Sequence, residues 1–129
     1  MINAKIIQIA SNTKYQGLEN NFTHKASIRN SICGDFITIE ILADKNKILT
    51  MRYETESCIL CEASASLLAN KIKNFKIKDL KKVEKLKDCI KKNKIIPKIF
   101  NVFKNLTNKT NQKRLNCVIL PLEGLLKAI

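Results

Sequence analysis

Apolar and polar side chains alternate in two neighbouring stretches of the chain, residues 35–42 and 48–53. A period of two is typical of β-strands, because successive side chains point to opposite faces of a sheet. The stretches are joined by ADKNK, in which Asp44 and Asn46 tolerate turn geometry, so the pattern predicts an antiparallel hairpin. A weaker first strand is expected around residues 24–30. The alternating apolar positions are Ile37, Ile39, Ile41, Leu49, Met51 and Tyr53.

After Ser57 the hydrophobic period lengthens to that of a helix. A second amphipathic helix is expected in residues 76–93, where apolar side chains recur among lysines. The two predicted apolar stripes consist of Cys61, Ala65, Leu68 and Ile72, and of Ile77, Leu80, Val83, Leu86 and Ile90.

In the last third of the chain the hydrophobic pattern predicts shorter helices and a loop. Residues 98–106 form a short apolar face after Pro97, and residues 107–112 read as a polar loop. A final helical stripe contains Val118, Leu122, Leu125 and Ile129, and Pro121 should begin, kink or disturb that helix. Strands followed by helices predict an α+β fold, with a three-stranded antiparallel sheet and helices packed on one face.

The length and composition fit one globular domain over residues 1–129. The chain has 45% hydrophobic and 27% charged residues, which excludes collagen-like and disordered classes. No stretch approaches the roughly 20 apolar residues that cross a bilayer, and the N-terminal segment is too short and too mixed for a signal peptide. We therefore expect a cytoplasmic protein with no membrane partner.

The formal net charge of +13 would suit nucleic acid, an anionic membrane surface or an acidic protein. Lysines are spread through residues 71–104, whereas the chain has only three arginines and no aromatic cluster typical of RNA-binding proteins. This pattern argues against a dedicated nucleic-acid role. Most of the lysines are expected to form a solvated face.

Five cysteines in a reducing compartment point to metal ligands, reactive thiols or core residues, and not to a disulfide framework. Cys33 precedes the first strong strand, Cys58 lies between the last strand and the first helix, and Cys117 opens the last helix. Side chains at the ends of elements can converge on one site. Gly34 allows Asp35 to reach the same point as Cys33.

Three thiolates and one carboxylate would form a tetrahedral set suited to zinc or to the iron of a cluster, with one harder ligand that can leave. The separations of the four residues match no compact zinc-finger pattern, so spacing alone also leaves open small buried thiols and a turn-stabilising aspartate. Cys61 lies on an apolar stripe and is expected in the core, although it could serve as a spare ligand or a resolving thiol.

Three motifs, SICGD, ESCILCEASASLLA and RLNCVILPLEGLL, resemble in order those of the U-type iron-sulfur scaffold family, which comprises the NifU N-terminal domain, IscU and SufU. The N-terminal KYQGLENN is similar to the segment before the first strand of that family. The lysine-rich segment between the second and third motifs resembles an insertion of the SufU type. Ser31 and Ser57 stand where the family usually has proline and glycine.

The resemblance implies that Cys33, Asp35, Cys58 and Cys117 bind Zn2+ or a transient [2Fe-2S] cluster. It also implies that the protein takes persulfide sulfur from a cysteine desulfurase and passes sulfur or a cluster to apo iron-sulfur acceptor proteins. Cys33 is the first candidate for sulfur acceptor and Cys117 the second.

Arg114 is a candidate partner contact, and an ordinary solvent-facing arginine is the competing interpretation. The alternative function is a basic, zinc-stabilised binding module for nucleic acid or an acidic protein, without sulfur transfer.

Overall fold

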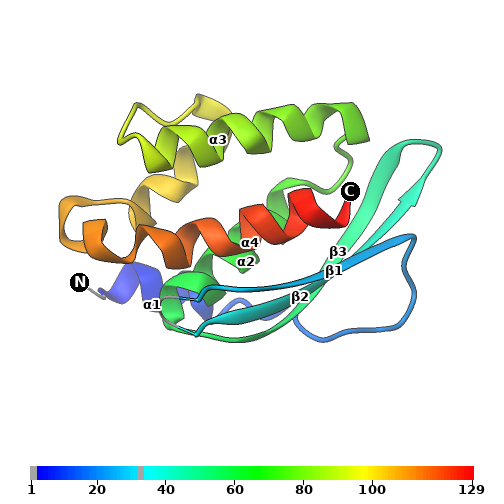
Figure 1. The fold of residues 1–129 in the computed structure, drawn as a ribbon, viewed down its shortest axis with the longest axis horizontal. Helices are drawn as coiled ribbons and strands as arrows, with labels where there is room; N and C mark the ends of the chain where they lie inside the picture. Colours follow the sequence, from blue (N-terminus) through cyan, green and yellow to red (C-terminus); the bar gives the residue numbers. More distant parts are fainter. Residues whose placement is uncertain (1–2, 32–33) are drawn as a thin grey trace.

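A computed structural model describes residues 3–31 and 34–129, with side chains except at 109 and 110. It confirms the predicted α+β fold, in which a three-stranded antiparallel sheet carries helices on one face (Figure 1). The elements in chain order are α1 (Ala4–Ala10), β1 (His24–Arg29), β2 (Phe36–Asp44), β3 (Lys47–Glu56), α2 (Ile59–Lys71), η1 (Ile77–Leu80), α3 (Lys81–Lys91), η2 (Lys98–Leu106), η3 (Lys109–Arg114) and α4 (Leu115–Ala128), where η marks a 3-10 helix.

The sheet has the order β1-β2-β3, with both neighbouring pairs antiparallel. The hairpin between β2 and β3 turns at Lys45 and Asn46, whose φ angles are 51° and 67°. Two successive positive φ angles are typical of the tight turns that match the twist of a hairpin. Register places Phe36 opposite Glu56, so the beginning of β2 and the end of β3 lie at the same end of the sheet.

The core lies between the inner face of the sheet and helices α2 and α4. Ile37, Ile39 and Ile41 are fully buried there, as their alternation predicts. A Cβ at Gly124 of α4 would lie 3.0 Å from Ile39 Cδ1 and 3.2 Å from Ile28 Cγ2. The glycine therefore lets α4 approach β1 and β2 closely, and α3 packs on the far side of α4 (Figure 1).

Some predicted features differ from the observed ones. Leu49, expected on the same strand face as Met51 and Tyr53, is 40% exposed, because a register shift between Leu42 and Ala43 leaves it without a partner on β2. The predicted polar loop at 107–112 is wrong in its second half, because residues 109–114 form η3 directly before α4. The second predicted helix begins with the 3-10 turn η1, and α1 was not predicted at all. Pro121 lies inside α4 without ending it, since proline removes one backbone donor but the rest of the helix is held by buried packing.

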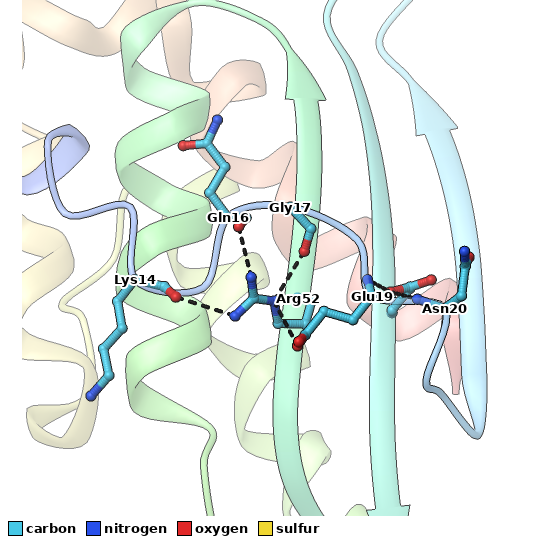
Figure 2. Close-up of polar contacts among 7 residues, drawn as sticks. Lys14, Gln16, Gly17, Glu19, Asn20 and Arg52 are labelled. Carbon is cyan, nitrogen blue, oxygen red and sulfur yellow. Dashed lines mark hydrogen bonds and ion pairs between the residues drawn. The ribbon is translucent and has the colours of Figure 1, made fainter.

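A segment of residues 14–20, here called the strap, crosses β3 and reaches β2 on the outer face of the sheet (Figure 2). The Arg52 guanidinium donates to the backbone carbonyls of Gly17, Gln16 and Lys14 at 3.0, 2.8 and 3.2 Å. The carboxylate of Glu40, the cross-strand partner of Arg52, accepts the backbone N–H groups of residues 19 and 20 at 2.9 and 3.3 Å. Two charged side chains thus fix the strap through its backbone.

Candidate metal centre

Three of the four predicted ligand residues come from three different elements. Asp35 immediately precedes β2, Cys58 is the N-cap residue of α2, and Cys117 lies in the first turn of α4. The first two meet because β2 begins where β3 ends, and α2 follows β3 after a two-residue connection. The packing of α4 on α2, β1 and β2 brings Cys117 to the same end of the sheet.

The potential ligand atoms of Asp35, Cys58 and Cys117 all lie within 4.8 Å of one another. Asp35 and Cys117 are buried, at 7% and 6% exposure, and Cys58 is half-buried. The sequence thus predicted that these three side chains meet. That they act as metal ligands is inferred from the chemistry of thiol and carboxylate groups. Cys33, the fourth predicted ligand, lies outside the residues that the structure describes.

The loop from Asn30 to Asp35 explains the glycine of the first motif. Asn30 N–H donates to the carbonyl of Asp35 at 2.8 Å, and Gly34 N–H donates to the carbonyl of Asn30 at 2.7 Å. Gly34 has a φ of 76°, and a Cβ there would meet nothing within 4 Å among the described residues. The glycine is therefore required for its positive φ and not for space. The contacts of Asn30 with Gly34 and Asp35 help to place the Asp35 carboxylate beside the thiols.

One oxygen of Asp35 is an orphaned polar atom. Its Oδ2 is buried and has no hydrogen-bond partner among residues 3–31 and 34–129. Buried carboxylate oxygens are normally paired, so an unsatisfied one beside two thiols has the character of a ligand atom. The donor set therefore fits a thiophilic cation such as Zn2+, or the iron of a cluster.

Burial is the main cause that raises the pKa of the Cys117 thiol far above its usual range. The neighbouring Cys58 and Asp35 raise it further, by hydrogen bonding to the protonated thiol and by charge. The three groups therefore repel one another when they are ionised without a cation. A bound cation would reverse this preference, because metal-bound thiols are deprotonated.

The three side chains line a cavity of about 290 Å3 together with Asn30, Lys113, Arg114 and Asn116. Arg114 is exposed at the N-terminus of α4, where it lines the cavity as a cation beside the acidic groups. Sequence reasoning named Arg114 but missed the other three. The only sequence signal of these three was adjacency to a motif residue, since Asn30 precedes SICGD, Asn116 precedes Cys117 and Lys113 precedes Arg114.

The other cysteines that the structure describes are free thiols beside the core. Cys61 is fully buried, in agreement with its predicted place on the apolar stripe, and its Sγ lies 3.9 Å from Thr55 Oγ1. Burial raises the pKa of the Cys61 thiol to about 12, because its effect is larger than that of the hydrogen bonds with Ser57 and Thr55, which lower the pKa. Cys89 is buried near the end of α3, away from the candidate centre.

None of the helices within residues 3–31 and 34–129 combines the length and hydropathy needed to cross a membrane.

Two comparisons with solved structures show the fold. The chain superposes on a putative iron-sulfur cluster assembly scaffold protein for the SUF system from Fervidobacterium islandicum, with a TM-score of 0.87 and 21% identity, over 98% of this chain and 95% of that one. A NifU-like protein (N-terminal) from Brucella abortus gives a TM-score of 0.82 at 20% identity, over 98% of this chain and 90% of that one.

Sequence comparisons reach the same group of proteins. A protein of Borreliella burgdorferi described as uncharacterized is 32% identical over 130 residues, which cover 96% of this chain and 79% of that protein. The iron-sulfur cluster assembly scaffold protein IscU of Thermotoga maritima is 25% identical over 80 residues, 62% of this chain and 56% of its own length. The family model described as NifU-like N terminal domain matches residues 1–129. The chain therefore belongs to the NifU-like N-terminal domain family.

Proposed function

We propose that this protein is an iron-sulfur cluster assembly scaffold or a zinc-dependent sulfur acceptor. The observation that carries the proposal is the convergence of Asp35, Cys58 and Cys117 within 4.8 Å at a cavity, in a chain of the NifU-like family. The relative from Thermotoga maritima carries the name of such a scaffold. Residues 1–129 are proposed to act as a single domain.

Cys33, Asp35, Cys58 and Cys117 are the proposed ligands of Zn2+ or of a transient [2Fe-2S] cluster. Three thiolates and one carboxylate carry two more negative charges than a divalent cation supplies. Lys113 and Arg114, which line the cavity, would offset part of that excess. Asp35 supplies the harder ligand, which exchanges more readily than a thiolate.

Sulfur would arrive as a persulfide of a cysteine desulfurase. A thiolate of this chain attacks the outer sulfur of that persulfide, the bond between the two donor sulfurs breaks, and the cysteine thiolate of the desulfurase leaves. Cys33 is the first candidate acceptor and Cys117 the second. Arg114 is exposed beside Cys117 and would contact the partner at this step. Sulfur or a cluster would then pass to apo iron-sulfur proteins in the cytoplasm.

Within the family we assign the chain to the SufU type. The support is the lysine-rich stretch between Cys58 and Cys117, which contains η1, α3 and η2. Asn116 directly precedes Cys117, at the position where a histidine is typical of the IscU type.

The alternative is a basic module whose zinc is structural, and its support is the net charge of +13. A structural zinc site is closed, whereas the proposed centre lines a cavity with a half-buried thiol. The open geometry favours exchange of metal or sulfur over a purely structural role.

The test mixes the purified protein with a cysteine desulfurase and cysteine. Metal content, sulfide release and the persulfide on each cysteine are then measured, the last by mass spectrometry of proteolytic peptides. We expect faster sulfide release and sulfur on Cys33 or Cys117, both lost in the Cys33→Ser Cys117→Ser double variant and retained in Cys89→Ser. Tightly held zinc with no stimulation and no persulfide would overturn the proposal in favour of the basic module.

A further inference from the structure

Cys58 and Cys61 form a C-x-x-C pair in the first turn of α2. The backbone N–H of Cys61 donates to the carbonyl of Cys58 at 3.1 Å, which closes this turn. Cys58 lines the cavity, whereas Cys61, three residues further along the chain, is fully buried and does not line it. The pair thus combines a thiol at the cavity, Cys58, with a buried thiol, Cys61, that can react only with a group of the same chain.

The Cys61 thiol lies in a polar niche within the apolar core. Thr55 Oγ1 lies 3.9 Å from its sulfur, and the same hydroxyl lies 2.7 Å from Ser57 Oγ. The Thr55 hydroxyl also donates to the Phe36 carbonyl at 2.6 Å. Because the single proton of the Thr55 hydroxyl goes to the Phe36 carbonyl, its oxygen is left to accept the S–H of Cys61, a contact that orients the thiol. Cys61 is also outside the three-residue ligand group.

We propose that Cys61 is a resolving thiol that reduces sulfane sulfur held on Cys58 and releases it as hydrogen sulfide. The Cys61 sulfur attacks the inner sulfur of the Cys58 persulfide, a Cys58–Cys61 disulfide bond forms, and the bond to the outer sulfur breaks. The outer sulfur leaves as hydrosulfide and takes up the proton of Cys61. It is reduced to sulfide while Cys61 is oxidised to the disulfide, so this step needs no other reductant.

The spacing of the pair suits this reaction. A disulfide needs Cα atoms about 4.4 to 6.8 Å apart, a range that includes residues three positions apart in a helical turn. Cys58 has extended backbone angles, with φ −73° and ψ 165°, and its side chain makes no cap hydrogen bond that would hold the thiol at the helix end. Two intervening residues make the closing loop short, which keeps its entropy cost low. Cys117, whose sulfur also lies within 4.8 Å of Cys58, is the competing partner.

The inference extends the proposed function, since it rests on sulfane sulfur that passes by thiol exchange from the acceptor Cys117 to Cys58, whose sulfurs lie within 4.8 Å of each other. Its test does not need a desulfurase. The metal-free full chain is treated with one equivalent of inorganic tetrasulfide as the sulfane donor, without added thiol. Unreacted donor is removed as soon as the chain is loaded, and the sulfide that the loaded chain then releases is measured. Trypsin cleavage after Arg52 and Lys71 places both cysteines on one peptide, so the disulfide makes that peptide two hydrogens lighter.

We expect about one sulfide per loaded wild-type chain, together with the lighter peptide. Cys61→Ser keeps a hydroxyl in the polar niche, and we expect it to retain one extra sulfur on the peptide and to lose at least nine-tenths of the sulfide release. Cys89→Ser, a matched change of a buried thiol away from the site, should behave as the wild type. Circular dichroism of each variant checks that it is folded.

Equal sulfide release from Cys61→Ser and the wild type would overturn the inference, as would a disulfide that joins Cys58 to Cys117. The two proposals can fail separately. A disulfide formed with tetrasulfide but no transfer from a desulfurase would sink the proposed function and leave the dithiol chemistry standing. Transfer from a desulfurase that leaves a lasting persulfide on Cys58 would support the proposed function and overturn the role of Cys61 as a resolving thiol.

Discussion

The molecule buries charged or acidic groups in two places, and they are paired very differently. Glu40 has one oxygen on two backbone N–H groups and the other 3.6 Å from Lys25 Nζ. Arg52 donates to three carbonyls and lies 3.2 Å from a Glu19 oxygen (Figure 2). At the candidate centre, Asp35 Oδ2 is buried with no hydrogen-bond partner among the described residues.

The difference separates a structural role from a ligand role. Glu40 Oε2, like Asp35 Oδ2, makes no hydrogen bond among the described residues, but Lys25 places an opposite charge beside it, whereas Asp35 forms no ion pair there. A buried charge stabilises a fold only where an opposite charge or hydrogen bonds balance it, as they do around Glu40 and Arg52. A carboxylate that is left unsatisfied beside two thiols costs stability without a cation and gains it with one. The strap contacts therefore hold the fold, whereas the unbalanced Asp35 carboxylate supports the proposal that this centre holds a bound group.

The largest expected effect is the loss of metal binding when a thiol ligand is removed. Cys117→Ala should weaken zinc binding by on the order of a thousandfold, because structural zinc sites bind with roughly 10 to 16 kcal/mol shared among four ligands. Competition with a zinc-selective dye measures the affinity. Cys89→Ala is the matched control and should bind zinc as the wild type does. Equal losses in both variants would mean that folding, and not coordination, was affected.

The next largest effect concerns the strap. Arg52→Ala removes three hydrogen bonds to backbone carbonyls and one ion pair, and it should lower the free energy of unfolding by about 2 to 3 kcal/mol. Urea unfolding followed by circular dichroism measures the change. Arg52→Lys keeps the charge but not the planar fork, so it should recover only part of the loss. The zinc affinity of the folded Arg52→Ala chain should equal that of the wild type. A weaker affinity would show that the strap also supports the candidate metal centre.

A smaller effect is the pH dependence caused by Cys61. Its pKa is raised to about 12 in the folded chain, whereas an unfolded thiol titrates near about 8.5. Between these two pKa values the Cys61 thiol is protonated in the folded chain and ionised in the unfolded chain. Its contribution to the free energy of unfolding is therefore fully present below about pH 8.5 and is lost as the pH rises toward the pKa of the folded chain. Over that pH range the free energy of unfolding of the metal-free wild type should fall more steeply than that of Cys61→Ser. The two slopes should differ by up to about 1.4 kcal/mol per pH unit. Identical slopes would contradict the burial argument.

The sequence predicted the parts of the fold that have strong periodicity. Alternation in residues 35–42 and 48–53 located the hairpin, because one face of each strand is buried. The 3-10 helix at 109–114 was missed because its residues are polar and its place is set by the connection to α4. The helix α1 was missed because it is short and buries only Ile6 completely.

The candidate centre could be predicted in part. Cys58, Cys117 and Asp35 were recognisable because each lies at the end of an element within a motif. Their distances could not be predicted, since they depend on how α4 packs across the sheet. Asn30 and Lys113 carry no motif of their own, and only the fold shows that they line the cavity.

The most direct test of the account is the zinc-induced rise in unfolding free energy in Asp35→Asn, compared with Glu40→Gln. Asp35→Asn should leave the metal-free stability equal or higher while losing at least tenfold in zinc affinity, because it removes a buried negative charge that has one unsatisfied oxygen and no ion pair among the described residues. Glu40→Gln should cost about 1 to 2 kcal/mol without metal and keep the full zinc-induced rise. A full zinc-induced rise in Asp35→Asn would contradict the claim that Asp35, Cys58 and Cys117 form one ligand centre.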